Sequence, residues 1–165
     1  MYKILLVVAV LTVTLISKAS NPDEKLVKIK YDGKIAIKTL QTNLRYVLNR
    51  KYFFKKIPKK LLFFKVTIMN GGAKKPIEAK IPANTVLYIC LDSGKKIKEN
   101  DIDEYAKNLK RKGWRTAGKI TTSDKRMKYV RVYMKKFSKD ATEEFLGVGF
   151  PGVMVLAKYM ELEKK

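Results

Sequence analysis

The sequence predicts a mostly β protein, an antiparallel β-sandwich of jelly-roll type with one short helix near residues 101–112. Three observations predict this fold: several short segments rich in β-branched and aromatic residues, glycine- and asparagine-rich turns between them, and a single stretch of helical periodicity. With 165 residues, of which 46% are hydrophobic, the chain suffices for one packed domain and is too short for two ordinary ones.

Three strands are expected in the first half of the chain. Residues 34–38 alternate polar and apolar side chains. Residues 61–69 are aromatic and β-branched and run into a turn signal, Asn-Gly-Gly, at 70–72. Residues 85–91 are almost continuously apolar, which predicts a strand that is buried on both faces.

Two more strands are expected in the second half. Residues 127–134 alternate, so Val130, Val132 and Met134 should share one face, and the tyrosines and arginine between them the other. Residues 153–157 follow a glycine-rich loop at 147–152 and are expected to form the closing strand.

The expected helix has clear start and stop signals. Asp101 is in position to cap it, with Glu104 three residues later as in a capping box. Basic residues at 110–112 suit a helix C-terminus, and Gly113 suits the residue that ends the helix.

Residues 1–19 have the layout of a secretory signal peptide. Lys3 supplies the positive region, residues 4–16 are predominantly apolar, and Ser17 and Ala19 are small residues at the cleavage positions. The apolar run is shorter than the roughly 18 to 20 residues of a membrane span. We therefore expect a secreted, extracellular protein whose single β-sandwich domain covers residues 20–165.

The charge of the chain is strongly unbalanced. Its 37 Lys and Arg residues outnumber 15 Asp and Glu residues, for a net charge of +22. Such an excess costs stability through self-repulsion, and so it favours a polyanionic partner. The alternative is compositional drift in a lysine-rich organism. The chain has no histidine and one cysteine, Cys90, which is expected in the core. An intermolecular disulfide is the alternative for Cys90.

The densest basic segment lies at residues 50–60. Lys55, Lys56, Lys59 and Lys60 are candidates for polyanion binding, and Tyr52 is a candidate for stacking on a sugar ring. The alternative is that the aromatic residues of this segment belong to the core and the lysines are merely solvated.

A second basic segment follows the expected helix. Lys110, Arg111, Lys112 and Arg115 are further candidates for polyanion binding, and Trp114 is a second candidate for sugar stacking. Because large aromatic side chains usually supply burial, a core position is the alternative for Trp114.

Several stretches in this order resemble an accessory domain. They are Asn49–Pro58, Thr85–Ser93, Gly113–Gly118, Thr121–Asp124, Tyr129–Tyr133 and Lys136–Phe137. Together they are similar to β-sandwich accessory domains attached to secreted polysaccharide lyases and related carbohydrate-active proteins. The resemblance implies a non-catalytic role in carbohydrate association or structural support, and it implies that the tryptophan belongs to the framework. The chain departs from the pattern at Ala117, which interrupts a Thr-Gly turn, at Phe150 and Pro151, and in having no attached catalytic module.

Nothing in the sequence predicts an enzyme. The acidic group at 101–104 is explained by helix capping, and Glu143 and Glu144 by an isolated helical turn, so the facing carboxylates of a glycosidase are not indicated. We expect no cofactor and no metal site. The expected function is a secreted binding or extracellular-matrix protein for acidic polysaccharide or another extracellular polyanion. The alternatives are a membrane-active cationic toxin or defence protein acting at a membrane surface, and a self-associating structural protein. Nucleic acid is disfavoured by the expected secretion.

Overall fold

The structure is a computed structural model that describes residues 26–70, 75–92, 99–125, 127–145 and 153–163. The expected signal peptide at 1–19, the turn at 71–72 and the glycine-rich loop at 147–152 lie outside the described residues.

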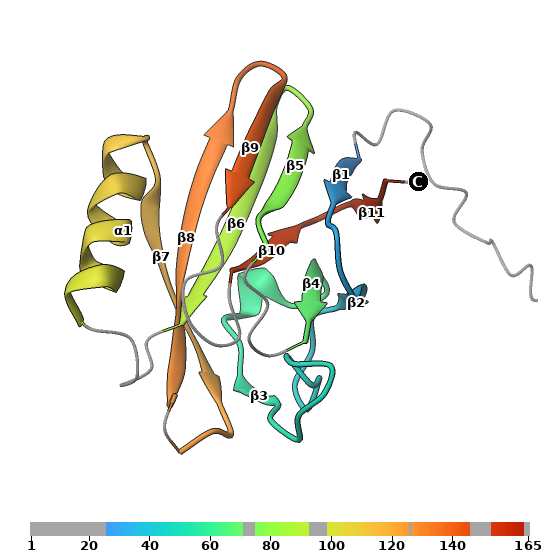
Figure 1. The fold of residues 1–165 in the computed structure, drawn as a ribbon, viewed down its shortest axis with the longest axis vertical. Coiled ribbons are helices and arrows are strands. Elements are labelled where there is room, and N and C mark those ends of the chain that lie inside the picture. Colours follow the sequence, from blue (N-terminus) through green and yellow to red (C-terminus); the bar gives the residue numbers. More distant parts are fainter. Residues whose placement is uncertain (1–25, 71–74, 93–98, 126, 146–152, 164–165) are drawn as a thin grey trace, which may run out of the picture.

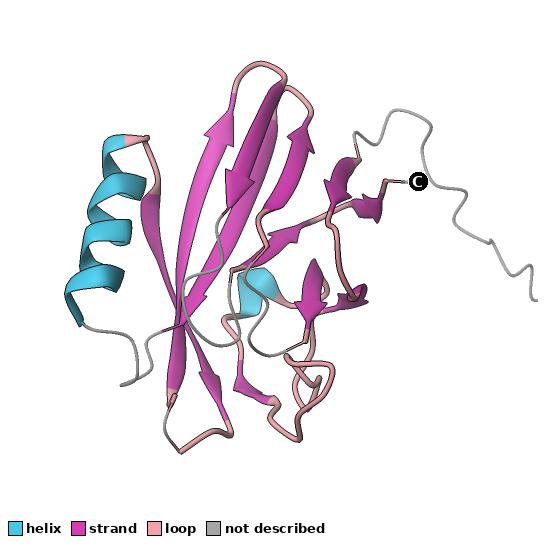
Figure 2. Ribbon diagram, in the orientation of Figure 1, coloured by secondary structure: helices cyan, strands magenta, loops and turns pink. Residues whose placement is uncertain are grey.

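Strands dominate the fold, as the sequence predicts (Figure 2). The described elements are β1 Val27–Lys30, β2 Ile35–Thr39, β3 Phe54–Lys56, the 3-10 helix η1 Lys59–Leu61, β4 Lys65–Met69, β5 Ile77–Ile81, β6 Thr85–Asp92, α1 Glu99–Arg111, β7 Arg115–Thr122, β8 Tyr129–Phe137, β9 Ala141–Phe145, β10 Met154–Ala157 and β11 Met160–Leu162.

The strands form the two sheets of a β-sandwich. The smaller sheet has the order β11-β1-β5-β9, and the larger has the order β2-β4-β10-β6-β8-β7-β3 (Figure 1). The neighbouring strands are antiparallel except β1 and β11, which pair in parallel with Val27 opposite Met160. The predicted fold class is therefore confirmed, with one parallel pair that the sequence did not reveal.

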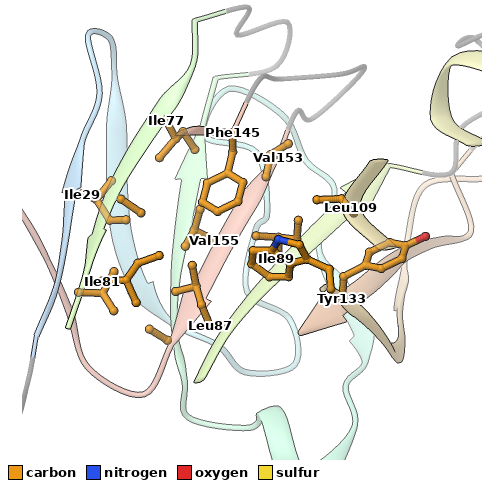
Figure 3. Close-up of a cluster of buried hydrophobic side chains, with 14 of the residues drawn as sticks. Ile29, Ile77, Ile81, Leu87, Ile89, Leu109, Tyr133, Phe145, Val153 and Val155 are labelled. Carbon is orange, nitrogen blue, oxygen red and sulfur yellow. The ribbon is translucent and has the colours of Figure 1, made fainter. Parts of the chain in front are cut away.

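A first hydrophobic cluster fills the space between the two sheets. Ile29, Ile77 and Ile81 come from the smaller sheet and face Leu87 and Val155 of the larger one (Figure 3). The alternation of buried and exposed residues along β1 and β5 places their charged side chains on the outer face of the smaller sheet. These short strands keep their register because a shift by one residue would move their apolar side chains from the buried face to solvent.

A second hydrophobic cluster covers the opposite face of the larger sheet. Residues 40–64 pack there, with Leu40, Phe54 and Leu61 against Val130 and Val132 of β8. The larger sheet is thus buried on both faces, and the nearly continuous apolar run of β6 follows from this, as predicted. Alternate residues of β8 belong to the two clusters, and Cys90 of β6 is fully buried in the second.

The expected strand at 61–69 is too long. Leu61 ends η1, and β4 begins only at Lys65, because the chain between them turns around Leu40. The amide of Phe63 donates to the carbonyl of Leu40 at 2.9 Å, and the amide of Leu40 donates to the carbonyl of Phe64 at 2.7 Å. Phe63 takes a positive φ of 68° in this turn.

The helix is confirmed with a corrected start. It begins at Glu99, so Asp101 lies inside its first turn and is not the capping residue. Its end is as predicted: Gly113 has φ of 84°, its amide donates to the carbonyl of Lys110 at 3.0 Å, and the amide of Trp114 donates to the carbonyl of Leu109 at 3.0 Å.

Three further expectations are corrected. The Thr-Gly turn around Ala117 is a register shift within β7, between Thr116 and Gly118, and the strand continues through it. Glu143 and Glu144 lie in β9 and not in a helical turn, because β9 pairs with β5 along its length. The strand at 153–157 does not close the fold: β10 lies between β4 and β6, and β11 follows it.

Candidate functional site

One layer of the molecule carries basic residues and no acidic ones. The sequence has no Asp or Glu between Asp32 and Glu78. We call residues 33–65 the basic layer; they form β2, β3, η1, the first residue of β4 and the loops between them, and residues 40–64 of this stretch cover the second hydrophobic cluster. Its basic residues are Lys34, Lys38, Arg45, Arg50, Lys51, Lys55, Lys56, Lys59, Lys60 and Lys65. All of them are exposed except Lys65, which is half-buried.

Four of the predicted polyanion-binding residues lie in the basic layer. Lys55 and Lys56 are adjacent in β3 and both are exposed, because the pairing of β3 with β7 shifts register there. Lys59 and Lys60 are exposed on η1, while Leu61 anchors this turn in the second cluster. The structure therefore presents all four side chains to solvent on two short elements whose apolar residues hold them in place.

Tyr52 lies beside these lysines and is half-buried. Its ring is stacked on that of Tyr46, with 6.3 Å between the centroids and 20° between the planes. Tyr46 is fully buried and also contacts Phe54, so Tyr52 is attached to the second cluster through one aromatic neighbour. Its role in stacking on a sugar stays a prediction.

The other basic candidates form a separate group, which we call the helix-end cluster: Lys110, Arg111, Lys112 and Arg115. All four are exposed at the end of α1 and the start of β7. The other end of β7, at Thr121 and Thr122, pairs with β3. Thr121 follows Arg115 by six positions along the strand, a span of about 20 Å. The two groups thus lie at opposite ends of β7, with exposed Lys119 between them.

The outer face of the smaller sheet is charge-balanced. Lys28 and Lys80 are cross-strand partners, but Lys28 also lies opposite Glu161, and Glu78 lies opposite Glu144. Lys80 donates to Glu163 at 2.6 Å; this hydrogen bond raises the pKa of Lys80 and lowers that of Glu163. The excess positive charge is therefore concentrated away from this face, on the side of the basic layer and β7.

Trp114 is not a surface platform. It is only 2% exposed and lies in the first cluster, edge-on to Phe137 and Phe145 at centroid distances of 6.2 and 5.7 Å. Its indole nitrogen is buried and has no hydrogen-bond partner among the described residues. A ring enclosed in this way cannot stack on a sugar, so the expected stacking role is wrong and the core alternative holds.

A pocket of about 270 Å³ lies between α1 and β9. Tyr105, Asn108 and Lys112 line it from the helix, and Glu143 and Glu144 from the strand. Burial, together with the Glu143 carboxylate, raises the pKa of Tyr105 to about 12. The Glu143 carboxylate forms an ion pair with the Lys135 ammonium at 2.8 Å, so it already has a structural partner. Two carboxylates at one wall make this pocket unsuitable for an anionic ligand.

The basic layer also contains an exposed aromatic residue that the sequence did not reveal. Phe63 is 72% exposed, although its neighbours Leu62 and Phe64 pack against the second cluster. Its place in an apolar run made it look like core, and nothing local distinguished it from Phe64.

No group of three or more potential metal-ligating side chains was found in the described parts of the chain. No helix within those parts is long and apolar enough to cross a membrane.

Comparison with known proteins supports the fold. No protein-family model matches the chain, and no curated protein matches it in sequence. Among solved structures, the chain is similar to part of a β-glucuronidase from glycoside hydrolase family 2, with a TM-score of 0.54 and 10% sequence identity. The match covers 79% of this chain and 14% of that one, so the chain spans a small fraction of the enzyme's length. The protein therefore shares a β-sandwich fold with a domain-sized portion of a carbohydrate-active protein.

Proposed function

We propose that the protein is an exported, non-catalytic binding protein that associates with acidic polysaccharide through the basic layer. The observation that carries this proposal is the exposure of Lys55, Lys56, Lys59 and Lys60 in a layer without a single carboxylate. Three ion pairs of the described residues, Lys75–Asp32, Lys80–Glu163 and Lys135–Glu143, lie outside that layer.

Repulsion between the lysines, and its relief by a bound polyanion, supports this proposal. Lysines crowded on one layer repel one another, and that repulsion is relieved when an anionic polymer replaces small counterions. Exposed lysines gain little from isolated surface ion pairs, so the layer has little structural use for its charge. The helix-end cluster is about 20 Å away along β7 and is proposed as a secondary contact for a long polymer.

The similarity to part of a β-glucuronidase is compatible with a carbohydrate ligand and does not identify it. A shared fold leaves function open, because function resides in the site and not in the architecture. The choice of acidic polysaccharide over other polyanions follows from the expected secretion and from the charge of the layer.

The test is polygalacturonate binding measured by isothermal titration calorimetry at several salt concentrations. The logarithm of the affinity should fall linearly with the logarithm of salt concentration. Replacing Lys59 and Lys60 with serine should weaken binding about tenfold and make that slope shallower by about 1.5, since each contact contributes roughly 0.7 to 0.9.

The matched control removes the same charge from another face. Replacing Lys28 and Lys30 with serine takes two exposed lysines from the outer face of the smaller sheet. Affinity and salt slope should stay near those of the unmodified protein. Equal losses for the two variants would show that net charge alone governs binding, and the basic layer would have no special role.

A further inference from the structure

Phe63 is the most unusual residue of the basic layer. Its side chain is large and apolar, yet it is 72% exposed, whereas Leu26 and Leu162, the other large apolar residues that are exposed in the described parts of the chain, are 40% exposed. Exposed single apolar residues are ordinary on protein surfaces. Phe63 differs from such ordinary exposed residues in a second, independent feature.

That feature is the backbone conformation. Phe63 has φ of 68°, in the left-handed region that is unfavourable for a bulky side chain. Among the described residues, the other non-glycine positions with positive φ are Asn43 and Asn84, a residue type that tolerates this region. An asparagine or glycine at 63 would satisfy the turn at lower cost, so the conformation by itself does not explain the presence of phenylalanine.

The surrounding structure enforces this conformation. The amide of Phe63 donates to Leu40, the amide of Leu40 donates to Phe64, and the amide of Phe64 donates to the carbonyl of Leu61 at 3.3 Å. Leu40 and Leu61 are fully buried, and the ring of Phe64 lies edge-on to Tyr88 at 5.5 Å. The turn is therefore anchored on both sides of Phe63, and its ring is presented to solvent from a fixed support. Strained residues held in this way cluster at functional sites.

Lysines lie near the exposed ring in the chain. Lys59 and Lys60 precede it on η1 and are both exposed. Lys65 follows it at the start of β4, but Lys65 lies opposite Ala157 of the first cluster and donates to the Thr39 hydroxyl at 3.2 Å, so its side chain is on the other face of the larger sheet. Lys38 of β2 lies opposite Val66, the residue after Lys65. An anionic ligand bound to Lys59 and Lys60 contacts residues that precede Phe63 by only four and three positions in the same anchored turn.

We propose that the ring of Phe63 is a stacking platform for one sugar ring of the bound acidic polysaccharide, with carboxylate or sulfate groups of the adjoining units held by Lys59 and Lys60. This inference rests on the proposed function and assigns its aromatic contact to Phe63, in place of Trp114. The apolar face of a sugar ring supplies a flat partner for the aromatic ring, while its anionic groups match the lysines.

The test compares two polymers that both carry carboxylates, polygalacturonate with sugar rings and poly-L-glutamate without them. Phe63→Asn removes the ring and suits the positive φ, and Phe63→Trp keeps an aromatic face. We expect Phe63→Asn to bind polygalacturonate about fivefold to tenfold more weakly, in the range of other aromatic stacking contacts. It should bind poly-L-glutamate as the unmodified protein does. Phe63→Trp should retain polygalacturonate binding, and thermal melting should show that both variants are folded.

The other possible results would each contradict a part of the proposal. If the unmodified protein binds neither polymer, the proposed function fails. If it binds polygalacturonate but Phe63→Asn loses nothing, or loses equally on both polymers, the stacking role is overturned while polyanion binding stands. If Phe63→Asn keeps its affinity for polygalacturonate and loses binding to vesicles containing phosphatidylserine, the ring serves a lipid surface, and the stacking role is again overturned.

Discussion

Replacing Trp114 tests whether this residue belongs to the hydrophobic core or contacts the ligand. The tryptophan is 2% exposed and makes edge-on contacts with Phe137 and Phe145. A buried tryptophan removes roughly 150 to 250 Å² from water, which corresponds to about 4 to 6 kcal/mol as an upper bound. We expect Trp114→Ala to cost about 3 to 5 kcal/mol, enough to unfold a domain of ordinary stability.

Trp114→Phe is the variant that keeps the fold. It preserves one aromatic ring beside Phe137 and Phe145 and removes an indole nitrogen that has no hydrogen-bond partner among the described residues. Loss of ring area costs stability, and removal of the unsatisfied donor offsets part of that cost. The expected net loss is about 1 kcal/mol, or a fall in Tm of about 2 to 4 °C.

The assay uses the fact that Trp114 is the single tryptophan of the chain. Its fluorescence should resist quenching by iodide and should not change when polygalacturonate is added. Circular dichroism in urea gives the stability of Trp114→Phe, and calorimetry gives its affinity for polygalacturonate, which should be unchanged. Protection from iodide that appears only with polymer, or a large loss of affinity at unchanged stability, would refute the core assignment.

The remaining predictions concern the buried Cys90, the helix α1 and the helix-end cluster. Burial raises the pKa of the Cys90 thiol, so we expect it to react with a thiol reagent only after denaturation; rapid reaction of the folded protein would contradict its position in the second cluster. Burial raises the pKa of Tyr105 from 10.0 to about 12, so the folded state binds this proton more tightly than the unfolded chain does. The associated stability is fully present below pH 10 and is lost as the pH rises from 10 towards 12; urea titrations should show a steeper alkaline loss for the unmodified protein than for Tyr105→Phe. Gly113→Ala meets no atom within 4 Å but imposes a side chain at φ of 84°, so it should lower stability by about 1 kcal/mol in denaturant titration, and an unchanged stability would contradict the helix end seen here. Neutralising the helix-end cluster should leave affinity for short galacturonate oligomers unchanged and reduce affinity for long polymer, and loss on the short oligomers would place the main contact there.

The strands with strong local patterns were predictable. β6 and β8 are long, and their apolar periodicity alone indicates which faces are buried. β9 was missed because its Glu143 and Glu144 have low strand propensity. It forms because its residues pair with β5 in full register, from Ile77 opposite Phe145 to Ile81 opposite Ala141, and such a contact between distant segments leaves no local signal.

The candidate site was predictable in part. The lysines at 55–60 were recognised from their density, and they are exposed as the proposal requires. The absence of carboxylates between Asp32 and Glu78 is also visible in the sequence. That residues 40–64 cover one face of the larger sheet, and that the helix-end cluster lies at the far end of β7, depend on strand pairing.

The sequence by itself determined the strand-rich composition, the helix with its glycine end, and the large positive charge, because each of these is a property of residues close together in the chain. The tertiary structure alone decided which aromatic residue meets solvent. Trp114 is enclosed by β8 and β9, whereas Phe63 is turned outward by hydrogen bonds to Leu40, and both results come from packing between segments that are far apart in sequence. Burial is set by those distant partners, so the chemical character of a side chain cannot reveal it alone.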